Sequence, residues 1–450
     1  MAVGLLAVAC GNAGSSKPIA VATTRPGAPP ISEVSGGALH TNVPLNAVPG
    51  VTNSQINVAV ITAGTNPLAG DYTRFADGVQ AYFDMINAQG GIYGRKLVIS
   101  AKHDDQFVND EQTVKASLAQ DHVFATFIAT ALFTGAPDIA ASNPPMPTFM
   151  WNINEEFAGK PNLFGSMGAI CFTCQSQIWP YIAQAEHRPR VAVLAYGGIA
   201  ASKNYAEGVK ASFAKYPSAK LAYFDPNLQV AQADLSAEVA QMKAKHVQLV
   251  FTSIDQNETL ILGKEIAKQR LDAVQYVNNL YDPKFVHDNA QYLEGDFVAP
   301  QFAALENTPQ PPVEQEFVKW MGKSGKAVSE LPGYGWIDAL QFVEGLKLAG
   351  PNFSQQKVID SLNQDTHFDA DGMIVPINWT KQHNDPGGPN GTANQYAGKY
   401  ECVSLTEVHN GAFVPVLTKP GKPWVCMSGG PNAPTLTKNA IYANFTDTAG

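Results

Sequence analysis

Four of the five cysteines are placed where sulfur chemistry is conceivable: Cys171 and Cys174 in the sequence CFTC, and Cys402 and Cys426 farther along the chain. A CxxC pair can be a redox motif, half of a zinc site, or a short disulfide. A zinc site needs a second close pair, and a thioredoxin-type site needs a strand-to-helix context; neither is evident here. We therefore predict two structural disulfides, Cys171–Cys174 and Cys402–Cys426, in an oxidising compartment, although three pairings are possible.

Other signatures of catalysis or metal binding are weak. The chain has no HExxH, P-loop lysine or GxSxG motif, and FGSMG lacks the first glycine. The segment DADG is similar to part of a calcium loop, but His367 stands at the first ligand position and the later acidic ligand is missing. We therefore expect no metal, no cofactor and no enzymatic activity.

The composition is that of a globular protein. The 450 residues are 45% hydrophobic and 15% charged, which is enough for two or three domains with cores. The formal net charge of −9, without any basic run, argues against nucleic acid as a partner. No apolar stretch reaches the length of a membrane span.

The first residues, MAVGLLAVACGN, resemble the end of a bacterial lipoprotein signal, in which Cys10 would be lipidated. Ala7 stands where leucine is usual, and no Lys or Arg precedes the apolar run. The alternative is an ordinary cysteine in a frayed terminus. Residues 11–54 are rich in Ser, Gly, Pro, Thr and Ala, which predicts a flexible linker. We expect an extracytoplasmic protein of the cell envelope, held at the membrane only by its lipid anchor.

Strand and helix patterns alternate from residue 55 onward. INVAVITA (56–63) is a nearly unbroken apolar run, as in a strand buried on both faces. Phe75, Val79, Phe83 and Ile86 form one helical stripe, and KLVISAK (96–102) alternates like a strand. Further strands are predicted at 122–129, 146–152, 190–197, 220–225, 246–253 and 274–279, and further helices at 134–142, 204–216, 234–245, 258–269, 312–325 and 333–350. The order indicates parallel βαβ units in two similar halves, 55–170 and 190–296.

The predicted fold class is α/β, with two doubly wound three-layer αβα lobes joined by a multi-strand hinge. Lobe 1 comprises 55–174 plus 299–376. Lobe 2 comprises 175–298 plus 377–450, the latter including a C-terminal extension. In such lobes, ligands lie beyond the carboxyl ends of the strands, and hinge closure can bury them.

The stretch INVAVITAGTNPLAGDYTRFADGVQAYFDMINAQGGIYGRKLVISAKHDDQ (56–106) resembles the opening of type I solute-binding proteins of ABC transporters, in the branched-chain amino acid and amide subgroup. FDADGMIVPINW (368–379) resembles the last hairpin turn of that family. The resemblance makes 87–95 a structural turn of lobe 1. It implies a monomer that captures a small amino acid, amide or related carboxylate by hinge closure and delivers it to permease subunits. A ligand-sensing ectodomain and, less favoured, an exported enzyme are the alternatives.

The resemblance places ligand contacts in loops that follow strands: Phe133, Thr134, Trp151 and Asn152 in lobe 1, and Tyr205, Asp255 and Tyr281 in lobe 2. Thr134 and Asn152 would hold the polar head of the ligand, and Asp255 would hold a cationic group. The aromatic side chains would pack on its apolar part.

Each candidate has a structural alternative. Phe133 and Trp151 could be core aromatics at strand ends. Tyr205 could pack against the helix below it, and Asp255 could cap a helix. The chain also has Gly165 or Ser166 where the family often has an arginine, which bears on the ligand more than on the fold.

Overall fold

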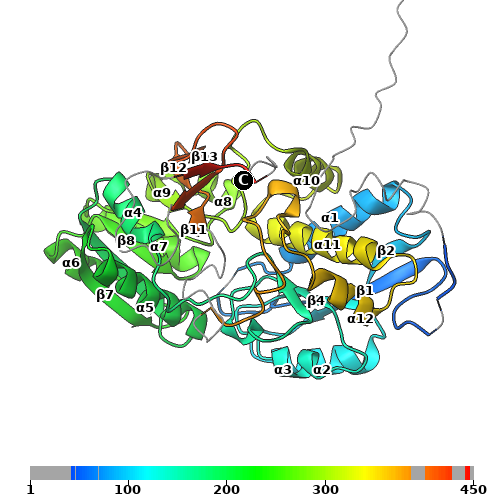
Figure 1. Cartoon of the computed structure of the whole chain (residues 1–450). Helices are drawn as coiled ribbons and strands as arrows, with labels where there is room; N and C mark the ends of the chain where they lie inside the picture. The colour runs from blue at the N-terminus through cyan, green and yellow to red at the C-terminus, as the bar shows by residue number, and fades with distance from the viewer. Residues whose placement is uncertain (1–41, 46, 69, 387–400, 428–440, 446–450) are drawn as a thin grey trace, which may run out of the picture.

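The computed structural model describes residues 42–45, 47–68, 70–386, 401–427 and 441–445. Cys10 and the predicted linker up to residue 41 lie outside this range. The described residues form two lobes side by side, each a sheet covered by helices (Figure 1). None of the described helices combines the length and apolarity needed to cross a membrane.

Lobe 1 is built on a five-stranded parallel sheet with the order β2-β1-β3-β4-β5. Its strands are β1 (Gln55–Thr62), β2 (Lys96–Asp104), β3 (Ala125–Ala129), β4 (Thr148–Met150) and β5 (Leu163–Gly165). Its helices are α1 (Arg74–Ala88), α2 (Asp110–Gln120), α3 (Ala136–Ala140), α10 (Pro312–Lys323), α11 (Glu330–Ala349) and α12 (Gln355–Leu362), with 3-10 turns η2 (Glu155–Phe157) and η3 (Ala370–Gly372). The apolar strands are buried as their composition predicts.

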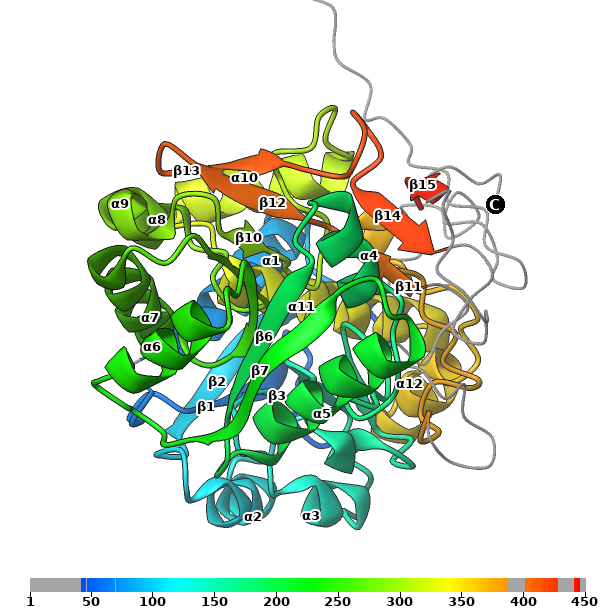
Figure 2. The same ribbon diagram turned by 90° about the vertical axis from the view of Figure 1, so that its left-hand side faces the viewer.

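Lobe 2 repeats this strand order and extends it. Its sheet runs β13-β12-β10-β9-β8-β6-β7, in which β12 and β13 form an antiparallel edge. The strands are β6 (Arg190–Tyr196), β7 (Lys220–Leu228), β8 (Leu249–Ser253), β9 (Val274–Val277), β10 (Phe297–Val298), β12 (Thr406–His409) and β13 (Ala412–Pro415). The helices are α4 (Ile178–Ala185), α5 (Ala200–Lys215), α6 (Ser236–Ala244), α7 (Gln256–Gln269), α8 (Pro283–Asp288) and α9 (Ala290–Leu293), several of which are visible in Figure 2.

Three connections lead from one lobe to the other, after β5, after β10 and after η3. The predicted hairpin turn near the third connection is present: Phe368 and Ile377 exchange backbone hydrogen bonds. A small antiparallel sheet, not predicted from the sequence, contains β11 (Glu401–Val403), β14 (Trp424–Met427) and β15 (Ile441–Ala443) and lies beside lobe 2 in Figure 2.

The turn between α1 and β2 is held by two buried or half-buried side chains. Asn87 bonds the backbone of Leu97 through both its amide nitrogen and its oxygen, at 2.9 and 2.8 Å. The Arg95 guanidinium donates to the carbonyls of Val43 and Thr52, both at 2.7 Å. Gly91 has φ +78°, and a Cβ there would lie 2.1 Å from the Arg95 carbonyl oxygen. This motif is therefore structural, as predicted.

The long returning helix α11 lies against α1 (Figure 1). A Cβ on Gly78 of α1 would lie 1.9 Å from the carbonyl oxygen of Pro332, and a Cβ on Gly335 of α11 would lie 2.0 Å from that of Phe75. Only glycine permits this backbone approach. The contact fixes the start of α11 against lobe 1.

Helix α10, which also packs against α1, carries a buried carboxyl group. Glu314 is fully buried, neither carboxylate oxygen has a hydrogen-bond partner among the described residues, and burial raises its pKa to about 9. Because the pKa is raised in the folded state, the contribution of Glu314 to stability falls as pH rises from about 4.5 toward about 9.

We expect Glu314→Gln to raise the free energy of unfolding by roughly 1 kcal/mol or more near pH 8, and by less near pH 5. Thermal or urea unfolding at the two pH values measures the difference. Glu316→Gln is the matched control, because Glu316 lies on the same helix but is paired with Lys319, which lowers its pKa. Equal effects of Glu314→Gln at both pH values would contradict a raised pKa.

Candidate functional site

A cavity of about 170 Å³ lies between the lobes, where strands of both sheets end. Its walls include residues that follow five strands: Leu68 and Tyr72 after β1, Trp151 and Ile153 after β4, Ile199 after β6, Ile254 and Asp255 after β8, and Asn278 and Asn279 after β9. The connections between the lobes contribute Ser166, Met167, Pro300, Gln301, Val375 and Pro376. This is the position that two open parallel sheets predict for a ligand.

The lining of this cavity is mostly apolar, and we call it the apolar chamber. Seven aromatic side chains border it: Tyr72, Trp151, Phe172, Tyr196, Tyr205, Tyr276 and Trp424. The described lining residues include no Lys, Arg or His. Such a chamber favours an uncharged or cationic apolar group over an anion.

Three of the predicted ligand residues line the apolar chamber. Trp151 packs between Tyr72 and Tyr334, with ring centroids 5.7 and 6.1 Å away. Tyr205 projects from α5 and meets Trp179 edge to face at 5.3 Å. Both rings therefore belong to the core and to the cavity wall at once, so the two interpretations of the sequence are compatible.

Asp255 also lines the chamber, and it caps α7 as the alternative interpretation proposed. Its Oδ1 accepts a hydrogen bond from the Asn257 backbone N–H at 3.1 Å, and its own N–H donates to the Tyr196 hydroxyl at 2.9 Å. Gly70 of lobe 1 faces it, since a Cβ there would lie 3.2 Å from Oδ2. Asp255 is thus positioned by lobe 2 and covered by lobe 1.

Phe133 and Thr134 lie elsewhere. Phe133 is buried in the core of lobe 1, and Thr134 is exposed at the start of α3, outside the lining of the cavity. The Asp110 carboxylate at the start of α2 accepts hydrogen bonds from the N–H groups of Thr134 and Gly135, both at 2.7 Å. That interaction holds the loop after β3 against α2. The two backbone N–H groups already bond Asp110.

Asn152 and Tyr281 also lie outside the apolar chamber. Asn152 is fully buried, and its side-chain amide donates to the carbonyl of Gly168. Tyr281 borders a neighbouring space; its hydroxyl donates to Glu306 at 2.7 Å, and its ring stacks on Phe413 at 4.8 Å. Both side chains stabilise segments near the cavity.

A second space of about 270 Å³, the polar chamber, adjoins the first. It is bordered by Asp71, Arg74, Gln256, Asn257, Asp282 and Ser329, among others. Five residues line both chambers: Tyr72, Trp151, Asp255, Asn279 and Glu330. We call these five the junction.

Sequence reasoning missed three junction residues, Tyr72, Asn279 and Glu330. Tyr72 lies in the loop after β1, so the rule that ligands meet strand ends could have found it. Glu330 begins α11, far along the chain, and nothing in its local sequence indicates a cavity. Its Oε1 accepts from the Tyr334 hydroxyl at 2.5 Å, and its backbone N–H donates to the Tyr281 carbonyl at 2.8 Å.

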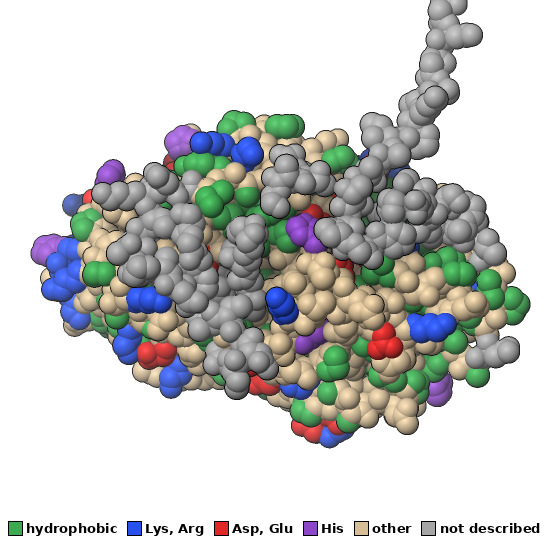
Figure 3. Space-filling view, in the orientation of Figure 1, with side chains coloured by type: hydrophobic (Ala, Val, Ile, Leu, Met, Phe, Trp, Pro, Cys, Tyr) green, Lys and Arg blue, Asp and Glu red, His purple; other side chains and the backbone are tan. Residues whose placement is uncertain are grey.

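The junction carboxyls are buried without a cationic partner in the apolar chamber. Burial raises the pKa of Asp255 to about 7 and that of Glu330 to about 8. Burial, and then the nearby carboxyls led by Asp255, raise the pKa of the Tyr72 phenol well above its usual value. Lys and Arg are present on the molecular surface in Figure 3, so their absence from the chamber lining is local.

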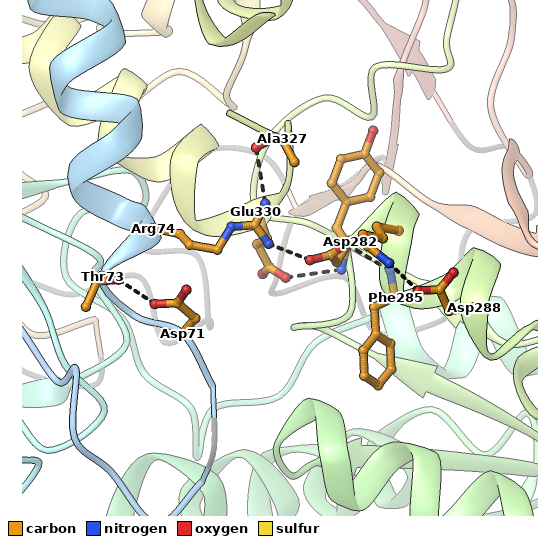
Figure 4. A network of polar contacts seen from close by, with 10 residues as sticks. Asp71, Thr73, Arg74, Asp282, Phe285, Asp288, Ala327 and Glu330 are labelled. Atoms are coloured by element: carbon orange, nitrogen blue, oxygen red, sulfur yellow. Dashed lines mark hydrogen bonds and ion pairs between the residues drawn. The ribbon is translucent and has the colours of Figure 1, made fainter. Parts of the chain in front are cut away.

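The lobes are joined across the polar chamber by side-chain contacts. Figure 4 shows Arg74 reaching from α1 of lobe 1 to Asp282 at the start of α8 in lobe 2, with a nitrogen–oxygen distance of 2.6 Å. The same guanidinium donates to the carbonyl of Ala327 at 3.1 Å. Asn257 of lobe 2 donates to the carbonyl of Leu68 in lobe 1 at 3.2 Å. The structure therefore holds the lobes together at the rim of the cavity.

Both predicted disulfides are present. Cys171–Cys174 lies in the first connection between the lobes, and Cys402–Cys426 joins directly opposed residues of β11 and β14. Cys402 also borders the apolar chamber. The bonds stabilise segments that form one wall of the cavity.

A family model for periplasmic binding proteins matches residues 55–408. The chain belongs to this family. Membership implies an extracytoplasmic location, and both the family and its structural neighbours are binding proteins. No curated protein sequence matches the chain.

Solved structures of binding proteins have the same fold. A fatty acid ABC transporter substrate-binding protein from Thermomonospora curvata is 16% identical, with a TM-score of 0.65 over 90% of this chain and 96% of that one. A leucine-binding protein from Thermotoga maritima is 14% identical, with a TM-score of 0.62 over 80% and 97%. A branched-chain amino acid ABC transporter protein from Thermus thermophilus, with bound valine, is 14% identical, with a TM-score of 0.61 over 82% and 96%. At these identities, the likeness extends to the fold alone.

Removal of the ion pair between Arg74 and Asp282 should change the shape of this binding protein. We expect Arg74→Gln to open the lobes and raise the radius of gyration in small-angle X-ray scattering without ligand, because a half-buried pair of about 1 kcal/mol is lost. Lys284→Gln is the control, since it removes an exposed pair with Asp288 inside α8. Superimposable scattering curves for Arg74→Gln and wild type would contradict a role for this pair in closure.

Proposed function

We propose that this protein captures a small amphipathic solute between its lobes and delivers it to the permease subunits of an ABC importer. The observation that carries the proposal is the largely apolar cavity at the strand ends of both lobes, walled by three connections. Closure of the lobes would bury a solute there. Three structural neighbours support a transport role: a fatty acid ABC transporter substrate-binding protein, a leucine-binding protein, and a branched-chain amino acid ABC transporter protein with bound valine.

The sequence predicts an amino acid, amide or related carboxylate, and we propose that the solute has an apolar part and a nitrogen-bearing group. Trp151 and Tyr205 would pack on the apolar part of the solute, and Asp255 would hold its nitrogen-bearing group. We further propose that the protein acts as a monomer, with Cys10 carrying a lipid that tethers it near the permease.

A thermal-shift screen of the purified chain tests the function. The compounds would be branched-chain and aromatic amino acids, amides, ureas and short fatty acids. A ligand at about a hundred times its dissociation constant should stabilise the protein by roughly 2.7 kcal/mol, a visible shift. A folded protein that responds to no compound class would contradict the proposal.

A substitution at Trp151 tests whether this side chain contacts any compound that binds. We expect Trp151→Phe to weaken binding by about threefold to tenfold, because a smaller ring loses contact area with the solute. Trp320→Phe is the control, since Trp320 lies on α10, outside both chamber linings, and bonds Glu316. Isothermal titration calorimetry measures both. Equal affinities for the two variants would contradict contact between Trp151 and the solute.

A further inference from the structure

The junction combines two aromatic rings with two carboxyl groups. Tyr72 and Trp151 lie 5.7 Å apart between ring centroids, and Asp255 and Glu330 border the same two chambers. Asp255, Glu330 and Trp151 are all at least nine-tenths buried, and the Trp151 indole N–H has no hydrogen-bond partner among the described residues. A cation near such rings is attracted both by the ring faces and by the carboxylates.

The charge around the junction is strongly one-sided. The two chambers are bordered by four carboxyl groups, those of Asp71, Asp255, Asp282 and Glu330, and by one guanidinium, that of Arg74. Arg74 already bonds Asp282 and the Ala327 carbonyl, as Figure 4 shows. A carboxylate brought to the junction would therefore meet like charges, whereas an ammonium would meet opposite ones.

Several groups that the sequence offered for a solute carboxylate already have partners. The N–H groups of Thr134 and Gly135 bond Asp110, and the Asn152 amide bonds the Gly168 carbonyl. The described lining of the apolar chamber offers no basic side chain. The carboxylate of an amino acid would lose its hydration there and would gain no basic partner from the described lining.

The size of the apolar chamber fits a single flat body. Its volume of about 170 Å³ is close to that of an engineered protein cavity of about 150 Å³ that binds benzene. Aromatic side chains from both lobes border it, including Tyr196 and Tyr205 from lobe 2. An aromatic ring would fill the chamber and place a short substituent at the junction.

We propose, building on the solute-binding function above, that the preferred ligand is an organic cation without a carboxylate. It carries an ammonium group on a short arm from a flat apolar body. The body occupies the apolar chamber, and the ammonium lies at the junction, against Asp255 and Glu330 and the rings of Tyr72 and Trp151.

This ligand class has a distinctive pH dependence. In the free protein, burial raises the pKa of Asp255 to about 7, with Glu258 adding repulsion, and raises that of Glu330 to about 8, with Asp282 adding repulsion. The other titratable or charged groups beside them are Tyr72 and Tyr196 for Asp255, and Tyr334 and Arg74 for Glu330. Because an ammonium binds the ionised carboxyls, its binding releases protons and strengthens as pH rises through this range.

Isothermal titration calorimetry of the purified full chain tests the proposal with four matched probes. These are phenethylamine, L-phenylalanine, 3-phenylpropionate and 2-phenylethanol, which share a ring and differ in charge. We expect phenethylamine to bind at least about tenfold more tightly than the other three near pH 8.5. From about pH 8.5 to about pH 5.5, its affinity should fall by about thirty-fold or more, from the titration of Asp255 alone.

Two variants separate charge from shape. Asp255→Asn keeps a residue that caps helices equally well but removes the charge, so we expect at least about tenfold weaker phenethylamine binding, a flatter pH profile and little change for 2-phenylethanol. Glu330→Gln should act in the same direction. Asp272→Asn is the control, because Asp272 is exposed and outside both chamber linings.

The outcomes distinguish this inference from the function on which it rests. Tighter binding of L-phenylalanine or 3-phenylpropionate than of phenethylamine would overturn the cation proposal and leave solute binding intact. Preference for 2-phenylethanol, or phenethylamine binding that Asp255→Asn and Glu330→Gln do not change, would also overturn it. Failure of the probes and of every compound in the thermal-shift screen would overturn both.

Discussion

The close packing of α11 on α1 is the constraint on which the site depends. Gly78 and Gly335 allow the two helices to approach until backbone meets backbone. This contact returns the chain from lobe 2 to lobe 1 and fixes the first turn of α11. Glu330 therefore borders the cavity, and Tyr334, one helical turn later, stacks on Trp151 and donates to Glu330. A side chain larger than hydrogen at either glycine would push α11 outward and move Glu330 from the junction.

Around that contact, several carboxyl groups are buried without an ion pair to another described residue. Burying an unpaired charge costs free energy, so these groups tend to take up protons and their pKa values rise. Glu314, which is outside both chamber linings, is buried in this way with no hydrogen-bond partner among the described residues. Asp255 and Glu330 differ because they face an empty space that a cation can enter. Burial of Asp255 and Glu330 destabilises the free protein at high pH, and it would strengthen the binding of a positively charged solute.

The structure brings some of the predicted ligand residues to the cavity and leaves others outside it. Trp151, Tyr205 and Asp255, which the family resemblance predicted, each follow a recognisable strand or lie on the helix after it, and all three border the cavity. Phe133 and Thr134 occupy an equivalent sequence position but not the cavity wall. The Asp110 carboxylate, which is distant in sequence, binds the backbone of their loop and turns it toward α2. Such a contact has no local sequence signal.

The sequence by itself determined the alternation of strands and helices and the turn held by Asn87 and Arg95. These depend on periodicity, turn chemistry and composition, which are local properties. The tertiary structure alone decided that Glu330 joins Asp255 at one junction and that Arg74 reaches Asp282. It also decided that no Lys, Arg or His is among the described residues that line the apolar chamber. These facts depend on how residues hundreds of positions apart are brought together when helices pack and lobes meet.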